Sequence, residues 1–224
     1  IKSITTISTP HNGTTLSPIL LDLFPFALNL APWIGIIDND QFEKFYNFDL
    51  EHWRLKKHPD EKIKEYFNRL KQSPITKSKN LCSWDLSLEG SADFNQEYTA
   101  DTEVYYFSYA SYATKPKKVN HKHVPDSAMS IHLWPTGLLI GQYGDAPNSA
   151  WYENDGISNT ISMTHPVGSN MKPYDGYLEK GVWQFVDKLH MDHQSVIGHH
   201  VNENEMNKII VLYKNHCSLL YSLK

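Results

Sequence analysis

Residues 103–113 read EVYYFSYASYA, and this run of tyrosine, valine and small residues decides the fold class. An apolar, aromatic-rich run of this length with few charges is typical of a strand that is buried on both faces of a sheet. We therefore predict a central strand here. Residues 1–9, IKSITTIST, predict another strand, which runs directly into a turn at PHNGTT.

Helical patterns alternate with these strands. Residues 59–72, PDEKIKEYFNRLKQ, predict a helix, since Pro59 suits a first turn and apolar residues recur on one face. Residues 203–223 predict a terminal helix, residues 114–126 a polar loop, and residues 132–144 remain unassigned. Strands that alternate with helices favour an α/β sheet. The apolar faces comprise Ile63, Tyr66, Phe67 and Leu70 in the first helix and Met206, Ile209, Ile210, Leu212, Tyr213 and Leu220 in the second.

The composition excludes some classes of function. The chain has 224 residues, 40% of them hydrophobic, which is enough for one large domain with a core. Its net charge of −4, without a basic block, argues against a nucleic-acid partner. The two cysteines, Cys82 and Cys217, are too few for a disulfide framework. They fit a reduced compartment and a cysteine-poor secreted protein equally well.

The chain begins with isoleucine inside an expected core strand, which predicts a fragment or a processed product. For this reason, the lack of a signal peptide says nothing about location.

The most apolar segment is residues 16–37, LSPILLDLFPFALNLAPWIGII. A membrane span needs about 20 unbroken apolar residues, but Asp22, Asn29 and three prolines interrupt this segment. We therefore expect no transmembrane segment. Two interpretations stay open: the segment forms buried core helices, or it forms a mobile apolar lid over an apolar binding site.

Residues 188–198, KLHMDHQSVIG, concentrate His190, Asp192 and His193, and His199 and His200 follow. Two imidazoles three positions apart can lie on one helix face and bind a metal ion. However, the chain has no HExxH motif and no CxxC pair. A metal-binding hydrolase is therefore an alternative that the pattern permits but does not favour.

A serine hydrolase of the α/β type orders its triad as serine, acid, histidine. Asp155, in ENDGISN, is a suitable loop acid because Asn154 and Gly156 make a turn, and ISNTISM then resumes an extended pattern. His193 follows 38 positions later. An aspartate that accepts the Nδ1 hydrogen of a histidine fixes its tautomer. From spacing alone, an ordinary Asp-Gly turn and a surface histidine are the favoured interpretation.

The nucleophile of such a triad would lie in G-x-S-x-G, on a turn from a strand to a helix. No serine of the chain lies in this motif. EGSAD and VGSNM each lack the second glycine, and neither follows an expected strand.

Several long motifs, in order along nearly the whole chain, resemble the secreted triacylglycerol lipases of the staphylococcal and Geobacillus type. The resemblance implies an α/β-hydrolase fold, with a mostly parallel sheet flanked by helices and with lid helices. Residues 1–224 would be the C-terminal part of that single domain, with the lid at about 16–37. The motifs are SITTISTPHNGTTL, YNFDLEHWRLKKHPDEKIKEYFNRLKQSP, WDLSLEGSADFNQ, TGLLIG, ENDGISNTISM, YDGYLEKGVWQ and MDH…IG.

The resemblance implies a role for three residues. Asp155 corresponds to the triad acid, His193 to the general base, and Asp85 in WDLSLEG to a zinc ligand. The family completes this zinc site with an aspartate and two histidines from its N-terminal half. The implied reaction is hydrolysis of triacylglycerols and other carboxylic esters at a lipid–water interface, by a secreted enzyme.

The chain also departs from the family. The serine elbow, the oxyanion-hole donors and three zinc ligands of the family lie upstream of residue 1, in the missing N-terminal half of the domain. The family usually places acids two and seven positions after the catalytic histidine, as calcium ligands, and here Ser195 and His200 stand there. Since calcium prefers carboxylate and carbonyl oxygens, these residues weaken a calcium site. We expect the chain alone to be inactive; the alternative is a non-catalytic truncated fragment.

Overall fold

The computed structural model describes residues 1–18, 58–73, 78–80 and 82–223. Contacts divide the chain into two compact units. One unit comprises residues 1–17 together with 85–224, and the other comprises residues 18–84. We describe each unit by itself.

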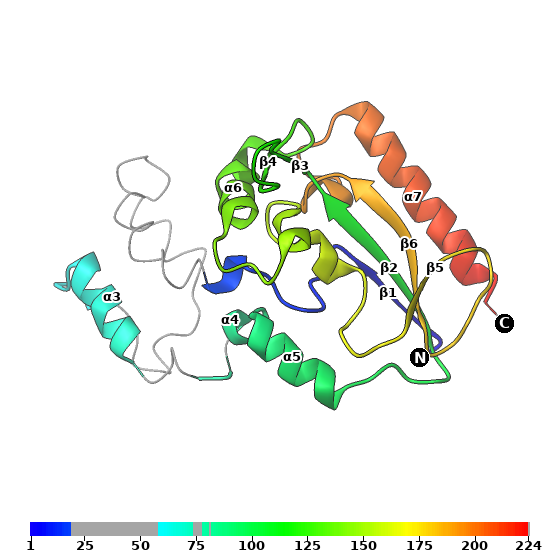
Figure 1. Ribbon diagram of the computed structural model, residues 1–224, viewed down its shortest axis with the longest axis horizontal. Helices are drawn as coiled ribbons and strands as arrows, with labels where there is room; N and C mark the ends of the chain where they lie inside the picture. The colour runs from blue at the N-terminus through cyan, green and yellow to red at the C-terminus, as the bar shows by residue number, and fades with distance from the viewer. Residues whose placement is uncertain (19–57, 74–77, 81, 224) are drawn as a thin grey trace. The chain divides into compact units, whose positions relative to one another are not determined.

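The larger unit is built on a four-stranded parallel sheet with the strand order β1-β2-β6-β5 (Figure 1). The expectation of a central strand at 103–113 is confirmed, because β2 pairs with β1 on one side and with β6 on the other. The strand expected at residues 1–9 is also confirmed, with shorter ends. The strands are β1 (Ser3–Ile7), β2 (Tyr105–Tyr112), β5 (Met171–Pro173) and β6 (Trp183–His190).

The core follows from the composition of β2. Phe107 and Ala110 are fully buried, and Tyr109 packs in a cluster with Leu189 of β6 and Val196. Large aromatic side chains bury much apolar area, which is the main favourable contribution to folding. The run EVYYFSYASYA therefore forms the strand against which the other elements of the sheet are assembled.

Helices flank this sheet, so the α/β architecture is confirmed. The helices of the larger unit are α5 (Leu88–Glu97), α6 (Trp134–Gln142) and α7 (Glu203–Tyr221). α4 (Cys82–Asp85) precedes them. Short 3₁₀ helices join the elements: η2 (Ile131–Leu133), η3 (Ser149–Tyr152), η4 (Thr160–Met163) and η5 (Ser195–Ile197).

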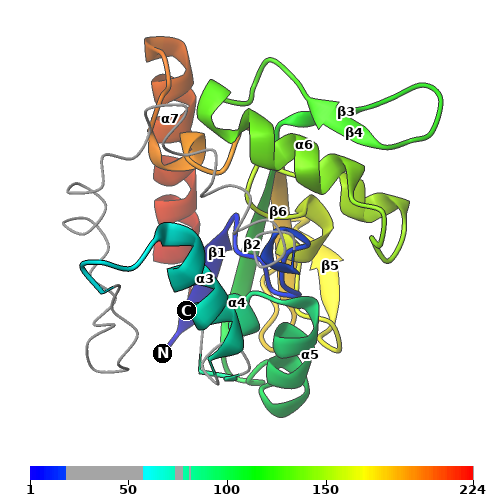
Figure 2. The ribbon, with the colours of Figure 1, turned by 90° about the vertical axis from the view of Figure 1, so that its left-hand side faces the viewer.

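The terminal helix α7 lies alongside the sheet (Figures 1 and 2). It begins at a capping box, in which the Asn202 side chain accepts from the N–H of Glu205 and the Glu205 carboxylate accepts from the N–H of Asn202. The buried His216 ties the helix to the sheet, since its ring nitrogens lie 2.7 Å from the hydroxyl of Thr5 and 2.9 Å from that of Tyr109. The helix expected at 203–223 is thus confirmed.

Two expectations were wrong. The predicted polar loop at 114–126 contains a hairpin of β3 (Thr114–Pro116) and β4 (His123–Pro125), whose charged residues hide the strand pattern. The segment ISNTISM, predicted to be extended, ends in the 3₁₀ helix η4. Side chains explain the second difference, because Thr160 and Ser162 turn their hydroxyls to backbone carbonyl oxygens.

The smaller unit contains α3 (Ile63–Gln72), so the helix predicted from Pro59 begins four residues later. Ahead of it, the Glu61 carboxylate accepts two hydrogen bonds of 2.8 Å from the Arg69 guanidinium. The hydrogen bond with Arg69 lowers the pKa of Glu61 to about 2.

The lid expected at about 16–37 lies outside the described residues from position 19 onward. Of the helices in the described ranges, none combines the length and apolar character of a membrane-spanning helix.

Candidate active site

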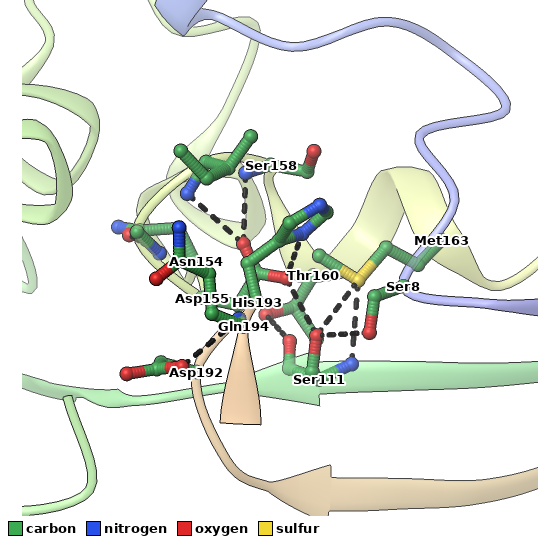
Figure 3. A network of polar contacts seen from close by, with 12 residues as sticks. Ser8, Ser111, Asn154, Asp155, Ser158, Thr160, Met163, Asp192, His193 and Gln194 are labelled. Atoms are coloured by element: carbon green, nitrogen blue, oxygen red, sulfur yellow. Dashed lines mark hydrogen bonds and ion pairs between the residues drawn. The ribbon is translucent and has the colours of Figure 1, made fainter. Parts of the chain in front are cut away.

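Asp155 and His193 meet beyond the carboxyl ends of β2 and β6, where parallel α/β sheets commonly carry their sites. The two atoms that join them, Nδ1 of His193 and Oδ2 of Asp155, lie 2.8 Å apart (Figure 3). The Asp155 side chain is fully buried, while that of His193 is 32% exposed. The structure therefore brings together the two residues that the sequence analysis selected as acid and base.

The turn that carries Asp155 orients its carboxylate. Oδ1 of Asp155 accepts from the N–H groups of Ile157 at 3.0 Å and Ser158 at 2.8 Å. Gly156, which follows Asp155, has φ +96°, and a Cβ there would lie 2.8 Å from the Cβ of Leu133. The Asp-Gly pair thus serves a conformation and a close approach that other residues would strain.

The other carboxylate oxygen is also shared. Oδ2 of Asp155 accepts from the hydroxyl of Ser111 at 2.6 Å as well as from His193. The carboxylate therefore accepts four hydrogen bonds in a fully buried position, and such bonds stabilise a buried anion.

The loop that carries His193 is held by a second buried carboxylate. Asp192 accepts from the N–H groups of Ser130 at 2.7 Å, Gln194 at 3.0 Å and Ser195 at 2.7 Å. Burial alone raises the pKa of Asp192, but the hydrogen bonds with Ser130 and Ser195 outweigh burial and lower the pKa below its usual value. Asp192 therefore positions the loop, as an anion, and does not pair with His193.

The electrostatic surroundings make His193 a stronger base than an ordinary histidine. Burial lowers its pKa, but the hydrogen bond and charge of Asp155, with the charge of Asp192, outweigh burial and raise the pKa. Because a carboxylate only accepts, Nδ1 carries the hydrogen in the neutral imidazole, which leaves the lone pair on Nε2. Among the described residues Nε2 has no hydrogen-bond partner, so it can accept a proton from a substrate or nucleophile.

The remaining histidines of the cluster take other positions. His190 bonds to Asp126 at 2.9 Å and stacks on Tyr112, with ring centroids 4.7 Å apart. His200 lies against His132, with centroids 5.1 Å apart. In the part of the chain that the structure describes, no group of three or more histidine, cysteine or acidic side chains is arranged to hold a metal ion.

The donor set for zinc is incomplete within the described residues. Asp85 ends α4 and is exposed, and it does not belong to any group of three potential ligands there. One carboxylate does not make a zinc site, which takes three or four protein ligands.

The donor set for calcium does not fit either. The N–H of Ser195 donates to Asp192, and the His200 ring faces His132. Glu205, a possible substitute, has its carboxylate at the N-terminus of α7, where it accepts from Asn202. No step of the chemistry below depends on a metal ion.

Sequence reasoning missed two serines beside Asp155. Ser8, at the end of β1, lies with its hydroxyl oxygen 2.7 Å from that of Ser111 in β2. A search limited to G-x-S-x-G passes over both, and no spacing marks them. Neither serine is placed as the nucleophile, because the hydroxyl of Ser111 bonds to Asp155 and that of Ser8 bonds to Ser111, and neither bonds to Nε2 of His193.

A cavity of about 540 Å³ lies between β6 and α7. Its lining includes Lys188, His190 and Glu205 but neither Asp155 nor His193, so it is separate from the pair.

Comparisons with known proteins show similarity to lipases. A family model described as "Lipase-like, C-terminal domain" matches residues 1–214. The lipase of Staphylococcus epidermidis is 34% identical over 199 residues, which cover 88% of this chain and 28% of that protein. Lipase 1 of Staphylococcus aureus (strain NCTC 8325 / PS 47) is 33% identical with the same coverage. The chain thus spans 28% of the length of these curated relatives.

Solved structures agree with this similarity. The crystal structure of Staphylococcus hyicus lipase matches with a TM-score of 0.70 at 28% identity, over 98% of this chain and 56% of that chain. EstA from Clostridium botulinum matches with a TM-score of 0.69 at 33% identity, over 90% of this chain and 50% of that chain.

Proposed function

Since this chain belongs to the family of lipase-like C-terminal domains, we propose that it supplies the acid and the base of a serine lipase. Asp155 is the acid and His193 the base. The observation that carries the proposal is the 2.8 Å hydrogen bond between them, in which a buried carboxylate orients a partly exposed imidazole. The substrate class is lipid esters, triacylglycerols among them, and the enzyme is a secreted one that works at a lipid–water interface.

In the proposed reaction, Nε2 of His193 removes the proton of a serine hydroxyl as the serine oxygen bonds to the ester carbonyl carbon. The imidazolium then donates this proton to the departing alcohol oxygen, which breaks the ester bond and leaves an acyl-serine. In the second half of the reaction, His193 removes a proton from water as the water oxygen bonds to the acyl carbon. The imidazolium then returns the proton to the serine oxygen, which releases the fatty acid. Asp155 holds the Nδ1 hydrogen throughout and stabilises the imidazolium.

In this proposal the serine comes from outside these 224 residues, because no serine here lies in G-x-S-x-G. In a protease precedent, loss of the triad serine costs about a millionfold in kcat. We therefore propose that the 224-residue chain alone has no measurable lipase activity. Asp85 would supply one zinc ligand in a site that also needs residues from elsewhere.

The missing motif also favours a second candidate, a member of the lipase family that has no catalytic role. The two candidates differ in whether the Asp155–His193 pair works once a nucleophile is supplied.

The test joins the chain to the nucleophile-bearing portion of the Staphylococcus epidermidis lipase and measures tributyrin hydrolysis. The proposal expects hydrolysis that His193→Ala abolishes and His190→Ala preserves, since His190 bonds to Asp126 and lies outside the pair. A folded joined protein that does not hydrolyse the ester, or whose activity survives His193→Ala, would support the non-catalytic candidate.

A further inference from the structure

Two serine hydroxyls continue the hydrogen-bond network beyond Asp155, from the same carboxylate oxygen that binds His193. Ser111 lies 2.6 Å from Oδ2 of Asp155, and Ser8 lies 2.7 Å from Ser111 (Figure 3). Ser8 and Ser111 are both buried. A buried hydroxyl costs free energy unless it is hydrogen-bonded, so both side chains depend on this arrangement.

The number of available hydrogens determines which group donates in each of these hydrogen bonds. A serine hydroxyl has one hydrogen, and an ionised carboxylate only accepts. Ser111 therefore donates its hydrogen to Asp155, and the hydrogen between the two serines has to come from Ser8. The order of donation is Ser8 to Ser111 to Asp155, and hydrogen bonds in such a chain polarise and strengthen one another.

The backbone at Ser8 indicates that its position matters. Its φ of +57° lies in the left-handed region, which is unfavourable for a residue with a Cβ. The N–H of Ser8 donates to the carbonyl of Tyr109 at 3.0 Å, which fixes this conformation at the end of β1. Strained conformations of this kind persist where surrounding contacts determine them, commonly next to functional sites.

Building on the lipase function proposed above, we propose that Ser111, supported by Ser8, is a positioning residue for the reaction. Its hydroxyl and the imidazole of His193 bind the same oxygen, Oδ2 of Asp155. Ser111 therefore takes up part of the negative charge that would otherwise act on His193, and so sets the strength of the hydrogen bond between Asp155 and His193. Among the described residues, the other charged group that acts on His193 is Asp192, whose hydrogen bonds go to Ser130, Gln194 and Ser195 and to neither of these serines.

The carboxylate does not need Ser111 to stay in place. Oδ1 of Asp155 keeps its bonds to the N–H groups of Ile157 and Ser158, and the N–H of His193 donates to the Asp155 carbonyl at 3.0 Å. Loss of the Ser111 hydroxyl should leave the pair assembled and leave more charge on Oδ2. A hydrogen bond that stabilises the imidazolium is then strengthened, which raises the pKa of His193.

The test measures the pKa of His193 in the full 224-residue chain, through hydrogen–deuterium exchange at the imidazole Cε1 read by mass spectrometry. We expect Ser111→Ala to raise this pKa by about half a unit and Ser8→Gly to raise it by less. Glycine is the suitable replacement at position 8 because it accepts a φ of +57° without strain. The matched control is Ser158→Ala, which removes a buried hydroxyl beside the same carboxylate; within the described part of the chain this hydroxyl has no hydrogen-bond partner.

An unchanged His193 pKa in both Ser111→Ala and Ser8→Gly would overturn the proposal, and so would an equal shift in Ser158→Ala. If Ser111→Ala does not fold, the Ser8→Gly result decides. The measurement needs neither a nucleophile nor a substrate. A joined protein without lipase activity would therefore count against the proposed function only, and an unchanged pKa against the role of the serines only.

Discussion

His193 and Asp155 are joined twice, through Nδ1 and Oδ2 at 2.8 Å and through the N–H of His193 and the carbonyl of Asp155 at 3.0 Å. The side-chain bond alone would leave the two loops free to separate. The backbone bond locks the loop after β6 onto the turn that carries Asp155. The imidazole is thus oriented before any substrate binds, and such preorganisation is where much of an enzyme's rate enhancement originates.

Asp155→Asn should lower the hydrolysis rate of the joined protein about ten-thousandfold, as the equivalent change does in a serine protease. The asparagine NH₂ favours the tautomer with hydrogen on Nε2, which cannot accept the serine proton. The measurement is tributyrin hydrolysis, with the melting temperature as control for folding. The double variant with His193→Ala should be no slower than His193→Ala alone, because the two residues act as a unit.

The acid limb of the pH–rate profile should lie above the ordinary histidine value of 6.5. Only neutral His193 accepts the serine proton, and its pKa is raised, so activity falls as pH drops through this raised value. The plot of kcat/KM against pH for the joined protein measures it. A midpoint below 6.5 would mean that burial of the imidazole outweighs the attraction of Asp155 and Asp192.

The sequence predicts the strand at EVYYFSYASYA because its apolar run dominates any alternative, and it predicts α7 through periodicity. It does not predict the hairpin at 114–126, where lysine, histidine and asparagine dominate and pairing alone creates the strands. The ISNTISM segment turns because hydroxyls bond to carbonyls far away in sequence. Such tertiary hydrogen bonds leave no local pattern.

The site divides in the same way. Asp155 and His193 stand in motifs that resemble the lipase family, so the resemblance, and not their spacing, selects both, and the structure brings them together. Ser8 and Ser111 are 103 positions apart, and only the parallel pairing of β1 with β2 makes them neighbours. The pairing register is therefore the information that the sequence pattern lacks.

The chain should lose stability in acid because of His11. Burial, with the nearby His165, lowers the pKa of His11 to about 4. The unfolded chain binds this proton from about pH 6.5 downward while the folded chain does not, so stability falls between pH 6.5 and 4. The full shift is worth about 3 kcal/mol, which partial exposure of the ring reduces to about 2 kcal/mol.

His11→Gln should flatten this dependence, since glutamine can keep a bond to the Thr6 hydroxyl, which lies 3.0 Å from Nε2 of His11. Urea unfolding at several pH values measures the effect. The control is His121→Asn, at an exposed histidine whose positive φ asparagine tolerates. An equal pH dependence in wild type and His11→Gln would assign the acid sensitivity to other groups, of which His216 shifts in the same direction.

Asp192→Asn should destabilise the chain by about 1–3 kcal/mol, because an amide replaces a charged acceptor of three backbone N–H groups and brings its own N–H donors into a buried site. Thermal melting measures the loss. In the joined protein the variant should also slow hydrolysis, since the His193 loop loses its anchor to Ser130. Full stability with reduced activity would indicate that Asp192 acts on His193 through its charge and not through the loop.

Calcium should not change the stability of the chain. By the resemblance to the family, Ser195 and His200 stand at positions where acids are expected. The carboxylate of Asp192 already closes the turn that leads to Ser195, through the N–H groups of Gln194 and Ser195. A calcium ion at a hundred times its Kd would add about 2.7 kcal/mol, which a melting curve detects easily. Equal melting temperatures in EDTA and in millimolar calcium are expected. A melting temperature that rises with calcium but not with magnesium would contradict this prediction. It would mean that further carboxylates complete a calcium site, and that a bound ion stabilises this loop together with the hydrogen bonds of Asp192.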